Sequence, residues 1–211
     1  VMNSRRHART SEHEEAAADL KKFDDVVRET ALRLCKLGFA VHWLRLRSKA
    51  PVEAGWPDIP VKTAEELMRT HQPAFNLGFR AGAPSIVDGL ALVVLDVDIK
   101  HPDFAEEAYA AAKSLMGGNF RPTVISGSGV GRHQFLRVPL EKAPNKAALT
   151  LRSADVAVLN DEPRIVRLGT PKSKPVWTIE LLSTGKNVVL PPSIHPDTGR
   201  QYEWADAEFV S

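Results

Sequence analysis

Two aspartates end the most apolar stretch of the chain. Residues 91–100 have the sequence ALVVLDVDIK, in which Asp96 and Asp98 follow a run of aliphatic residues and are separated by one valine. Alternate side chains of a strand lie on one face with their Cα atoms about 6.5–7 Å apart, so both carboxylates can reach one metal cluster. Mg²⁺ and Mn²⁺ prefer carboxylate oxygen, and phosphoryl-transfer enzymes use two such ions about 3.5–4 Å apart. The stretch predicts a buried strand with a metal site; the alternative is the solvated end of an ordinary strand.

A glycine-rich segment, ISGSGVGRHQFLRV, supplies candidate phosphate ligands. Its three glycines allow close backbone approach and can direct N–H groups at an anion. Together with His133, Arg132 and Ser128 they predict a polyphosphate site made of charge-assisted donors and a hydroxyl. The alternative is a plain hairpin connection. A Walker loop is excluded because no Gly-Lys-Ser/Thr follows, and a dinucleotide fingerprint is excluded because a strand follows instead of a helix.

A third carboxylate, Glu180, lies in the otherwise apolar segment WTIELL. An unpaired carboxylate in a buried strand is costly, so Glu180 needs either a metal or a cation such as Arg167, and both alternatives stay open. The chain then turns through PPSIH, after which Tyr202 and Trp204 are expected to pack back on the core.

The composition indicates an ordinary globular protein of one large domain or two small lobes. The chain has 211 residues, a formal net charge of +2 and one cysteine, Cys35, which excludes an internal disulfide and a cysteine-based zinc cluster. No apolar run approaches the roughly 20 residues that span a bilayer, and the first residues lack the apolar core of a signal peptide. We therefore expect a soluble, cytoplasmic protein without a membrane partner.

The elements that position these residues follow from periodicity and from capping signals. Residues 1–10 are expected to be a frayed lead-in, followed by an amphipathic helix that begins at a capping box of Ser11 and Glu14 and stops at Gly38. Further helices are predicted from Thr63 to about Thr70, with a capping box of Thr63 and Glu66, and from Asp103, as the cap, to Met116. Strands are predicted at residues 39–47, 75–80, 91–100, 123–126, 133–138, 165–168, 176–182 and 188–190.

The strands do not alternate regularly with helices, which favours an α+β protein with a mixed or antiparallel central sheet over a doubly wound parallel sheet. We expect two segments: residues 1–37, the lead-in and amphipathic helix, and residues 38–211, the catalytic domain.

Taken together, the motifs resemble the prim-pol (primase-polymerase) domain of the archaeo-eukaryotic primase superfamily, of the type found in plasmids, phages and mobile elements. The resemblance extends from about Gly38 to Trp204. It rests on Lys49-Ala50-Pro51 with Gly55-Trp56, Asn76-Leu77-Gly78 with Gly82, Asp96-Val97-Asp98, Gly131-Arg132-His133, Glu180, and the ending PPSIHPDTGRQYEW.

The resemblance implies an RNA-recognition-motif (RRM) type catalytic lobe beside a smaller α/β lobe, with the active site in the cleft between them. It implies that Asp96, Asp98 and Glu180 hold catalytic Mg²⁺ or Mn²⁺. His133, helped by Arg132 and Ser128, would bind the nucleotide triphosphate, and Lys186 and His195 are weaker candidates. The family commonly has serine two positions before its histidine, where this chain has Gly131, and the N-terminal helix is outside the shared pattern.

The expected function is template-directed nucleotidyl transfer by a DNA primase and polymerase. Its partners would be a single-stranded DNA template, a primer, NTPs or dNTPs and, in some arrangements, a helicase. Binding through the phosphate backbone would suit an enzyme that accepts every sequence. Two alternatives are a non-catalytic nucleic-acid-binding module of a replication initiator and a Mn²⁺-dependent glycosyltransferase, which also uses Asp-x-Asp. The third carboxylate and the Gly-x-His strand favour the primase-polymerase over the sugar enzyme.

Overall fold

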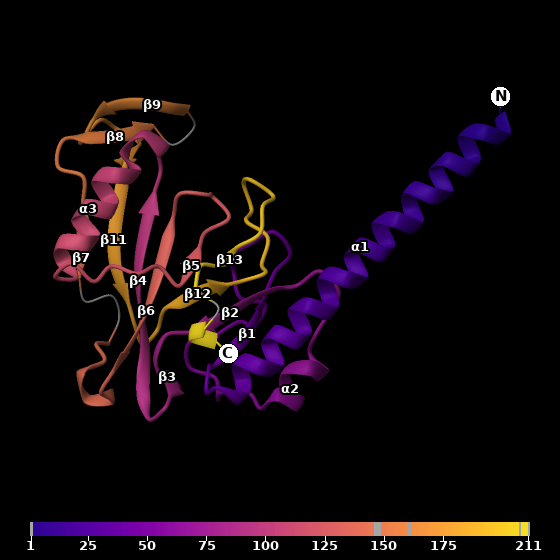
Figure 1. The fold of residues 1–211 in the computed structure, drawn as a ribbon, viewed down its shortest axis with the longest axis horizontal. Helices are drawn as coiled ribbons and strands as arrows, with labels where there is room; N and C mark the ends of the chain where they lie inside the picture. The colour runs from indigo at the N-terminus through magenta and orange to yellow at the C-terminus, as the bar shows by residue number, and fades with distance from the viewer. Residues whose placement is uncertain (1, 146–148, 160–161, 207, 211) are drawn as a thin grey trace.

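The computed structural model describes residues 2–145, 149–159, 162–206 and 208–210, which form a mixed α+β fold (Figure 1). The named strands of the described part form three sheets, and every pairing between them is antiparallel. The predicted α+β class is confirmed, and the doubly wound parallel alternative is wrong. None of the helices described combines the length and the apolarity needed to cross a membrane.

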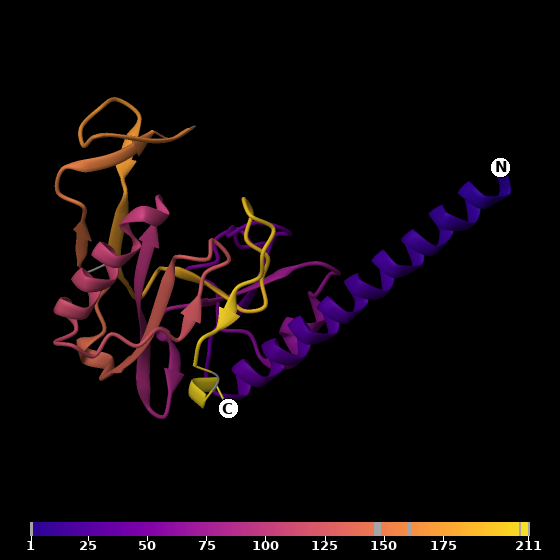
Figure 2. The same cartoon turned by 45° about the horizontal axis from the view of Figure 1, so that its top comes forward.

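The chain begins with one long helix, α1 (Met2–Lys36). Its N-terminal part projects away from the body of the molecule, and its C-terminal part packs against it (Figures 1 and 2). Val27, Ala31 and Leu34 recur at helical spacing and are fully buried in the core. The amphipathic pattern is therefore confined to the end of the helix that contacts the sheet.

The predicted end of this helix is confirmed, but its predicted start is wrong. Gly38 follows the helix with a φ of +97°, and a Cβ at this position would lie 1.8 Å from the carbonyl oxygen of Ile86. The helix already begins at Met2, so Ser11 and Glu14 do not cap it. No proline or glycine precedes Ser11, and nothing in that segment stops the helix from extending.

A small sheet follows, in the order β1-β2-β12. It consists of β1 (Val41–Leu44), β2 (Asn76–Arg80) and β12 (Asn187–Leu190). Between β1 and β2 lies α2 (Ala64–Arg69), which begins at the predicted capping box: the Glu66 amide donates to Thr63 Oγ1 and the Thr63 amide donates to Glu66 Oε2.

The main sheet has seven strands, in the order β13-β5-β6-β4-β11-β7, with β3 also paired to β4. Its members are β3 (Gly82–Val87), β4 (Leu90–Ile99), β5 (Val124–Ile125), β6 (Arg132–Val138), β7 (Thr150–Arg152), β11 (Trp177–Leu182) and β13 (Glu203–Trp204). The aspartate strand, β4, lies between β6 and β11, in the interior of the sheet.

Helix α3 (Ala105–Leu115) covers one face of the main sheet (Figure 1). It follows a short 3₁₀ helix, η1 (Pro102–Phe104), and two more such helices are η2 (Leu140–Lys142) and η3 (Glu208–Val210). Asp103 does not cap α3 as predicted. It lies within η1, where the His101 side chain accepts from its amide, and the N-cap residue of α3, Phe104, makes no side-chain capping bond.

A third sheet, in the order β10-β8-β9, lies at the carboxyl end of β4, opposite to β3 (Figures 1 and 2). It consists of β8 (Val156–Leu159), β9 (Glu162–Arg167) and β10 (Ser173–Pro175). Of these three strands only β9 was predicted, and β3, β7 and β13 were missed as well. All are short or interrupted by proline or glycine, which weakens the period-two signal.

Two hydrophobic clusters occupy the two faces of the main sheet. The first joins its Leu92 and Val94 to α1, β1, β2 and β12, and includes Tyr202 with Trp204 packed against it, as predicted. The second joins Leu95, Val97 and Ile99 to α3, β8 and β11. Alternate residues of β4 thus pack into different hydrophobic clusters on opposite faces of the sheet.

Candidate active site

The aspartate pair lies where the first core ends. Leu92 and Val94 face this core, and the next two positions on the same face of β4 are Asp96 and Asp98. The alternate residues Leu95, Val97 and Ile99 point to the opposite face and are buried in the core with α3. The strand therefore cannot rotate to direct its carboxylates to that face. The sequence pattern therefore determines where both acids point.

Strand register brings two further predicted residues beside Asp96. His133 on β6 is paired with Asp96 on one side, and Glu180 on β11 is paired with it on the other. Directly paired residues of antiparallel strands share a face, with Cβ atoms about 4.5–5.5 Å apart. His133 Nε2 lies 3.3 Å from Asp96 Oδ1. Asp96, Asp98, His133 and Glu180 thus lie on one face although they are far apart in the sequence.

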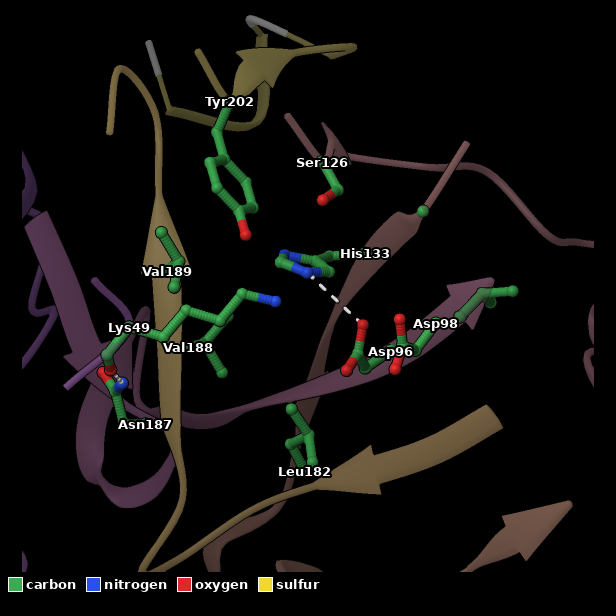
Figure 3. A pocket seen from close by; sticks show the side chains of 12 residues that line it. Lys49, Asp96, Asp98, Ser126, His133, Leu182, Asn187, Val188, Val189 and Tyr202 are labelled. Carbon is green, nitrogen blue, oxygen red and sulfur yellow. Dashed lines mark hydrogen bonds and ion pairs between the residues drawn. The ribbon is translucent and has the colours of Figure 1, made fainter. Parts of the chain in front are cut away.

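A polar pocket of about 110 Å³ opens above this face (Figure 3). It lies between β4 and β6 of the main sheet and β12 of the small sheet, and residues of the chain's loops close it. Its lining consists of Lys49, Asp96, Val97, Asp98, Ser126, Gly131, His133, Leu182, Asn187, Val188, Val189 and Tyr202. Because drug-sized ligands need about 300 Å³ or more, the pocket can hold ions and phosphate groups but not a whole nucleotide.

Lys49 places a cation in this pocket. Lys49 is an exposed residue, and its amine points toward His133 and Asp96 (Figure 3). Burial lowers the pKa of the Lys49 amine, but Tyr202, Asp98 and Asp96 outweigh this effect and raise it overall. Lys49 is therefore a fixed positive charge at neutral pH.

The loop that carries Lys49 is held by β12. Asn187 Nδ2 donates to the Lys49 carbonyl at 2.9 Å, while Asn187 Oδ1 lies 2.6 Å from His42 Nε2. Burial lowers the pKa of His42 to about 4, so this histidine is neutral and donates its Nε2 proton to Asn187. Lys49 therefore has a defined position relative to the aspartates.

The two partners in the His133–Asp96 contact both favour their neutral forms. Burial raises the pKa of Asp96 to about 7, and the negative charges of Asp98 and Glu180 contribute to this rise. Burial, helped by Lys49, lowers the pKa of His133 to about 4. His133 is therefore a neutral imidazole at pH 7, and its buried Nδ1 has no hydrogen-bond partner among the described residues. A ligand that reached Nδ1 would satisfy it.

Asp98 has a different partner. Its Oδ2 lies 2.6 Å from Nζ of Lys100, and both side chains are partly exposed. The acid pair is therefore asymmetric, with Asp96 buried against His133 and Asp98 ion-paired at the edge of the pocket.

The glycine loop does not present the predicted anion cradle. The amides of Ser126, Ser128, Gly129 and Gly131 are all hydrogen-bonded within the loop, and the Ser128 hydroxyl accepts from Gly131. Ser126, which was not among the predicted site residues, lines the pocket instead. The loop brings a serine beside the histidine, but a different one from Ser128.

The structure does not bring Arg132 to the pocket. It precedes His133 on β6 and therefore points to the opposite face, where it is paired with Val97. Its guanidinium donates to the carbonyls of Gly129 and Gly131 and lies over the ring of Tyr109. These contacts fasten the loop to α3.

The two weaker candidates lie outside the pocket lining. Lys186 lies in the turn before β12, where its backbone bonds Ser183 and Ala81. His195 is buried beside Tyr202, with ring centroids 5.8 Å apart, and burial lowers its pKa. His195 packs against Tyr202 and lies next to the site, but it does not line the pocket.

The donor set fits a hard divalent cation at the acid pair. Burial and the charge of Asp98 raise the pKa of Asp96, so its charged form is disfavoured in the metal-free site. A bound cation would neutralise the repulsion between the two carboxylates. Within the described ranges, however, no group of three His, Cys, Asp or Glu side chains is arranged to hold a metal ion, and Glu180 is not part of the pocket lining. No ion pair between Glu180 and Arg167 is found among those residues either. The part played by Glu180 stays a prediction.

Sequence reasoning missed Ser126, Lys49 and Tyr202 as pocket residues. Lys49 and Tyr202 had been noted, the first within a shared motif and the second as a core residue. All three precede or follow the strands, where no periodicity indicates the direction of a side chain.

Comparison with known proteins identifies a family for most of the chain. A family model described as Prim-Pol, bifunctional DNA primase/polymerase, N-terminal, matches residues 31–210. No curated protein matches the chain.

Proposed function

Because the chain belongs to the Prim-Pol family of bifunctional DNA primase/polymerases, we propose that it catalyses nucleotidyl transfer directed by a DNA template. The observation that carries the proposal is the pocket in which Asp96 and Asp98 lie beside His133 and Lys49. Two acids for a cation and two nitrogen groups for phosphate form the charge pattern that a metal-bound triphosphate requires.

In the proposed reaction, the 3′-hydroxyl of a primer, or of a first nucleotide, attacks the α-phosphorus of a bound nucleotide. The bond between the α-phosphorus and its bridging oxygen breaks, pyrophosphate leaves, and the hydroxyl proton is lost to solvent. Mg²⁺ or Mn²⁺, when bound, would neutralise phosphate charge and align the attacking and leaving oxygens. Asp96 and Asp98 would hold this cation, and Glu180 is the predicted third ligand.

The chain's own contribution is positioning and charge. Lys49 is protonated and would bind a phosphate oxygen, while His133 would contact another through Nδ1, the ring nitrogen that does not face Asp96. Ser126 and Tyr202 would complete the polar wall with their hydroxyls. Such preorganised donors act without reorganising during the reaction, which is the main source of catalysis in phosphoryl transfer.

We further infer the two-lobe arrangement from the origin of the lining residues. The main sheet with α3 corresponds to the RRM-type catalytic lobe, and the β1-β2-β12 sheet with α2 corresponds to the smaller lobe. The supporting observation is that β4 and β6 line the pocket from one side and β12 from the other. The family match does not favour the glycosyltransferase alternative. A plasmid, phage or mobile-element context, a helicase partner and a cytoplasmic location stay predictions from the sequence.

The decisive experiment is primer synthesis and extension on single-stranded template, with labelled nucleotides and Mn²⁺ or Mg²⁺. We expect products from the wild type and none from Asp96→Asn/Asp98→Asn, because the substitution removes the cation ligands and nearly preserves shape. Template affinity should stay similar or rise slightly, since acids near a phosphate backbone repel it. Asp88→Asn/Asp103→Asn, which neutralises two exposed acids, is the matched control. Wild-type protein that binds template but never extends it, and whose Tm does not rise with Mn²⁺, would leave only the non-catalytic binding module.

Nucleotide affinity separates the phosphate side of the pocket from the acid side. We expect His133→Ala and Lys49→Met each to weaken binding of a fluorescent nucleotide by roughly tenfold or more, since a charge-assisted hydrogen bond contributes about 1.5–3 kcal/mol. His133→Ala should change Tm little. Unchanged affinity, or a collapse of stability, would make His133 a structural core residue.

A further inference from the structure

The chain between β1 and Pro51 forms a basic loop at the edge of the pocket. Arg45, Leu46 and Arg47 are exposed at its tip, and Lys49, which lines the pocket, follows two residues later. Among the described residues, neither Arg45 nor Arg47 takes part in an ion pair. Their guanidinium groups are accessible to an anionic ligand, on the same loop as Lys49 of the proposed catalytic pocket.

The loop has a defined shape. Leu44 and Pro51 form an antiparallel bridge, the Arg45 amide donates to the Ala50 carbonyl at 2.9 Å, and the Ser48 amide donates to the Arg45 carbonyl at 3.1 Å. These bonds close the loop at its base and across its tip. The arginines are consequently held on a structured loop whose side chains remain exposed.

A third arginine extends this basic surface across the pocket edge. The Arg47 guanidinium lies beside the turn at Gly199, 3.8 Å from where a Cβ of residue 199 would be. The adjacent Arg200 donates through Nη2 to the carbonyl of Ser128 at 2.5 Å, and its guanidinium lies against Gly129. Arg47 and Arg200 thus extend the basic surface from the basic loop to the glycine loop. The turn between them contains one acid, Asp197, which is exposed.

Leu46 distinguishes this surface from a simple positive patch. With 54% of its area exposed, it is the most exposed of the large hydrophobic side chains in the described part of the chain, and it lies between two arginines. An exposed leucine between two arginines suits a single-stranded nucleic acid, in which apolar base rings alternate with phosphate groups.

We propose that Arg45, Leu46, Arg47 and Arg200 form a binding surface for single-stranded DNA, which guides the strand along the edge of the pocket. The arginines contact the phosphate backbone, and Leu46 packs on the face of a base or sugar. Contacts of this kind carry no sequence preference. The proposal rests on the proposed function, because it assigns the path of that reaction's template or primer.

The test compares three variants of the full chain by fluorescence anisotropy with a labelled mixed-sequence oligonucleotide over a range of salt. They are Arg45→Gln/Arg47→Gln, Leu46→Ser, and the control Arg28→Gln/Arg33→Gln, which removes the same charge from the exposed face of α1. For the first variant we expect affinity to fall at least tenfold and the slope of log K against log salt to decrease by about 1.4, or about 0.7 for each lost contact. Leu46→Ser should weaken binding without changing the slope, and the control should resemble the wild type.

Nucleotide binding and primer extension separate this proposal from the function on which it rests. Both loop variants should bind a fluorescent nucleotide as the wild type does, because Lys49 and His133 are intact. If the wild type extends primers but the arginine variant binds DNA like the control, the surface is wrong and the function stands. If the wild type does not extend primers yet the loop variants lose DNA binding, the function fails and the surface stands. Equal loss of nucleotide and DNA binding would assign these arginines to the nucleotide, and a wild type without affinity for single-stranded DNA would overturn both.

Discussion

Asp96 faces His133 across one strand pairing and Glu180 across the other, while Asp98 lies two residues along the same strand. Burial raises the pKa of Asp96, and the negative charges of Asp98 and Glu180 add to this rise. The environment of this residue is unfavourable for a charged carboxylate and favourable for a carboxylate that binds a cation. The stability of the metal-free protein should therefore depend on its protonation.

We predict that Asp96→Asn stabilises the metal-free protein more at pH 8 than at pH 5. The folded-state pKa, about 7, is above the ordinary value of 3.8, so protonated Asp96 contributes stability that is complete below pH 3.8 and lost as the pH rises through 7. The substituted amide has no proton to lose in this range and would keep this contribution, up to about 4 kcal/mol at 1.36 kcal/mol per pKa unit. Thermal melting in EDTA at both pH values measures the difference.

Asp88→Asn serves as the comparison, because Asp88 has an exposed side chain that pairs with Arg137 on the surface. Its Tm difference from the wild type should be small and similar at the two pH values. An Asp96→Asn gain that is equal at pH 5 and pH 8 would mean that burial does not raise the pKa of this carboxyl.

Among the elements, the glycine loop and the turn at residues 195–200 act as a pair. Thr198 Oγ1 donates to the carbonyl of Gly127 at 2.7 Å, and Arg200 reaches the next residue of the loop. The turn leads directly to Tyr202, which lines the pocket. The packing of these two segments therefore determines where the tyrosine hydroxyl lies relative to Lys49 and Ser126.

We predict that Gly127→Ala destabilises the protein by about 1–3 kcal/mol and weakens nucleotide binding. A Cβ at this position would lie 2.5 Å from the Arg200 carbonyl oxygen and 2.6 Å from the His195 Cβ, so the turn has to move and Tyr202 moves with it. Denaturant unfolding and nucleotide titration measure the two effects. Gly89→Asn is the control, since Gly89 has a φ of +78°, which asparagine tolerates, and open space around it. A Gly127→Ala protein that unfolds and binds like the wild type would show that the loop adapts at no cost.

At the scale of the whole molecule, α1 consists of two parts with different surroundings. Residues 14–22 are exposed on every side, whereas Val27, Ala31 and Leu34 belong to the same core as β1, β2 and β12. His71 Nε2 lies 3.1 Å from Asp24 Oδ1, which ties the helix to the segment between α2 and β2. The family model also begins within this second part, at residue 31.

We predict that a chain beginning at residue 21 melts like the full chain, and that a chain beginning at residue 38 is strongly destabilised. The first truncation removes only exposed helix, while the second exposes the core residues that pack against Val27, Ala31 and Leu34. Loss of one large buried side chain typically costs about 2–5 kcal/mol, so losing Val27 and Leu34 removes a large part of the roughly 5–15 kcal/mol that stabilises a typical domain. Circular dichroism melting compares the three chains. If the chain from residue 38 were as stable as the full chain, the predicted boundary at residues 37 and 38 would be a true domain boundary.

The sequence alone determined the local features of this fold. The capping box of Thr63 and Glu66 begins α2, Gly38 follows the end of α1, and the alternation of β4 places Asp96 and Asp98 on one face. Each depends on contacts between residues a few positions apart, so a short window of sequence contains the whole interaction. The same alternation shows that Arg132 and His133 point to opposite faces, a signal that was available for correcting the predicted phosphate site.

Only the tertiary structure decided which distant residues meet. Strand register places His133 and Glu180 beside Asp96, and loop packing brings Lys49, Ser126 and Tyr202 into one pocket while leaving Ser128 and Lys186 outside it. Backbone hydrogen bonds between strands are the same for every residue type, so they do not specify a partner strand or its register. The register is determined instead by the two cores on either face of the main sheet, whose packing involves residues from nearly the whole length of the chain.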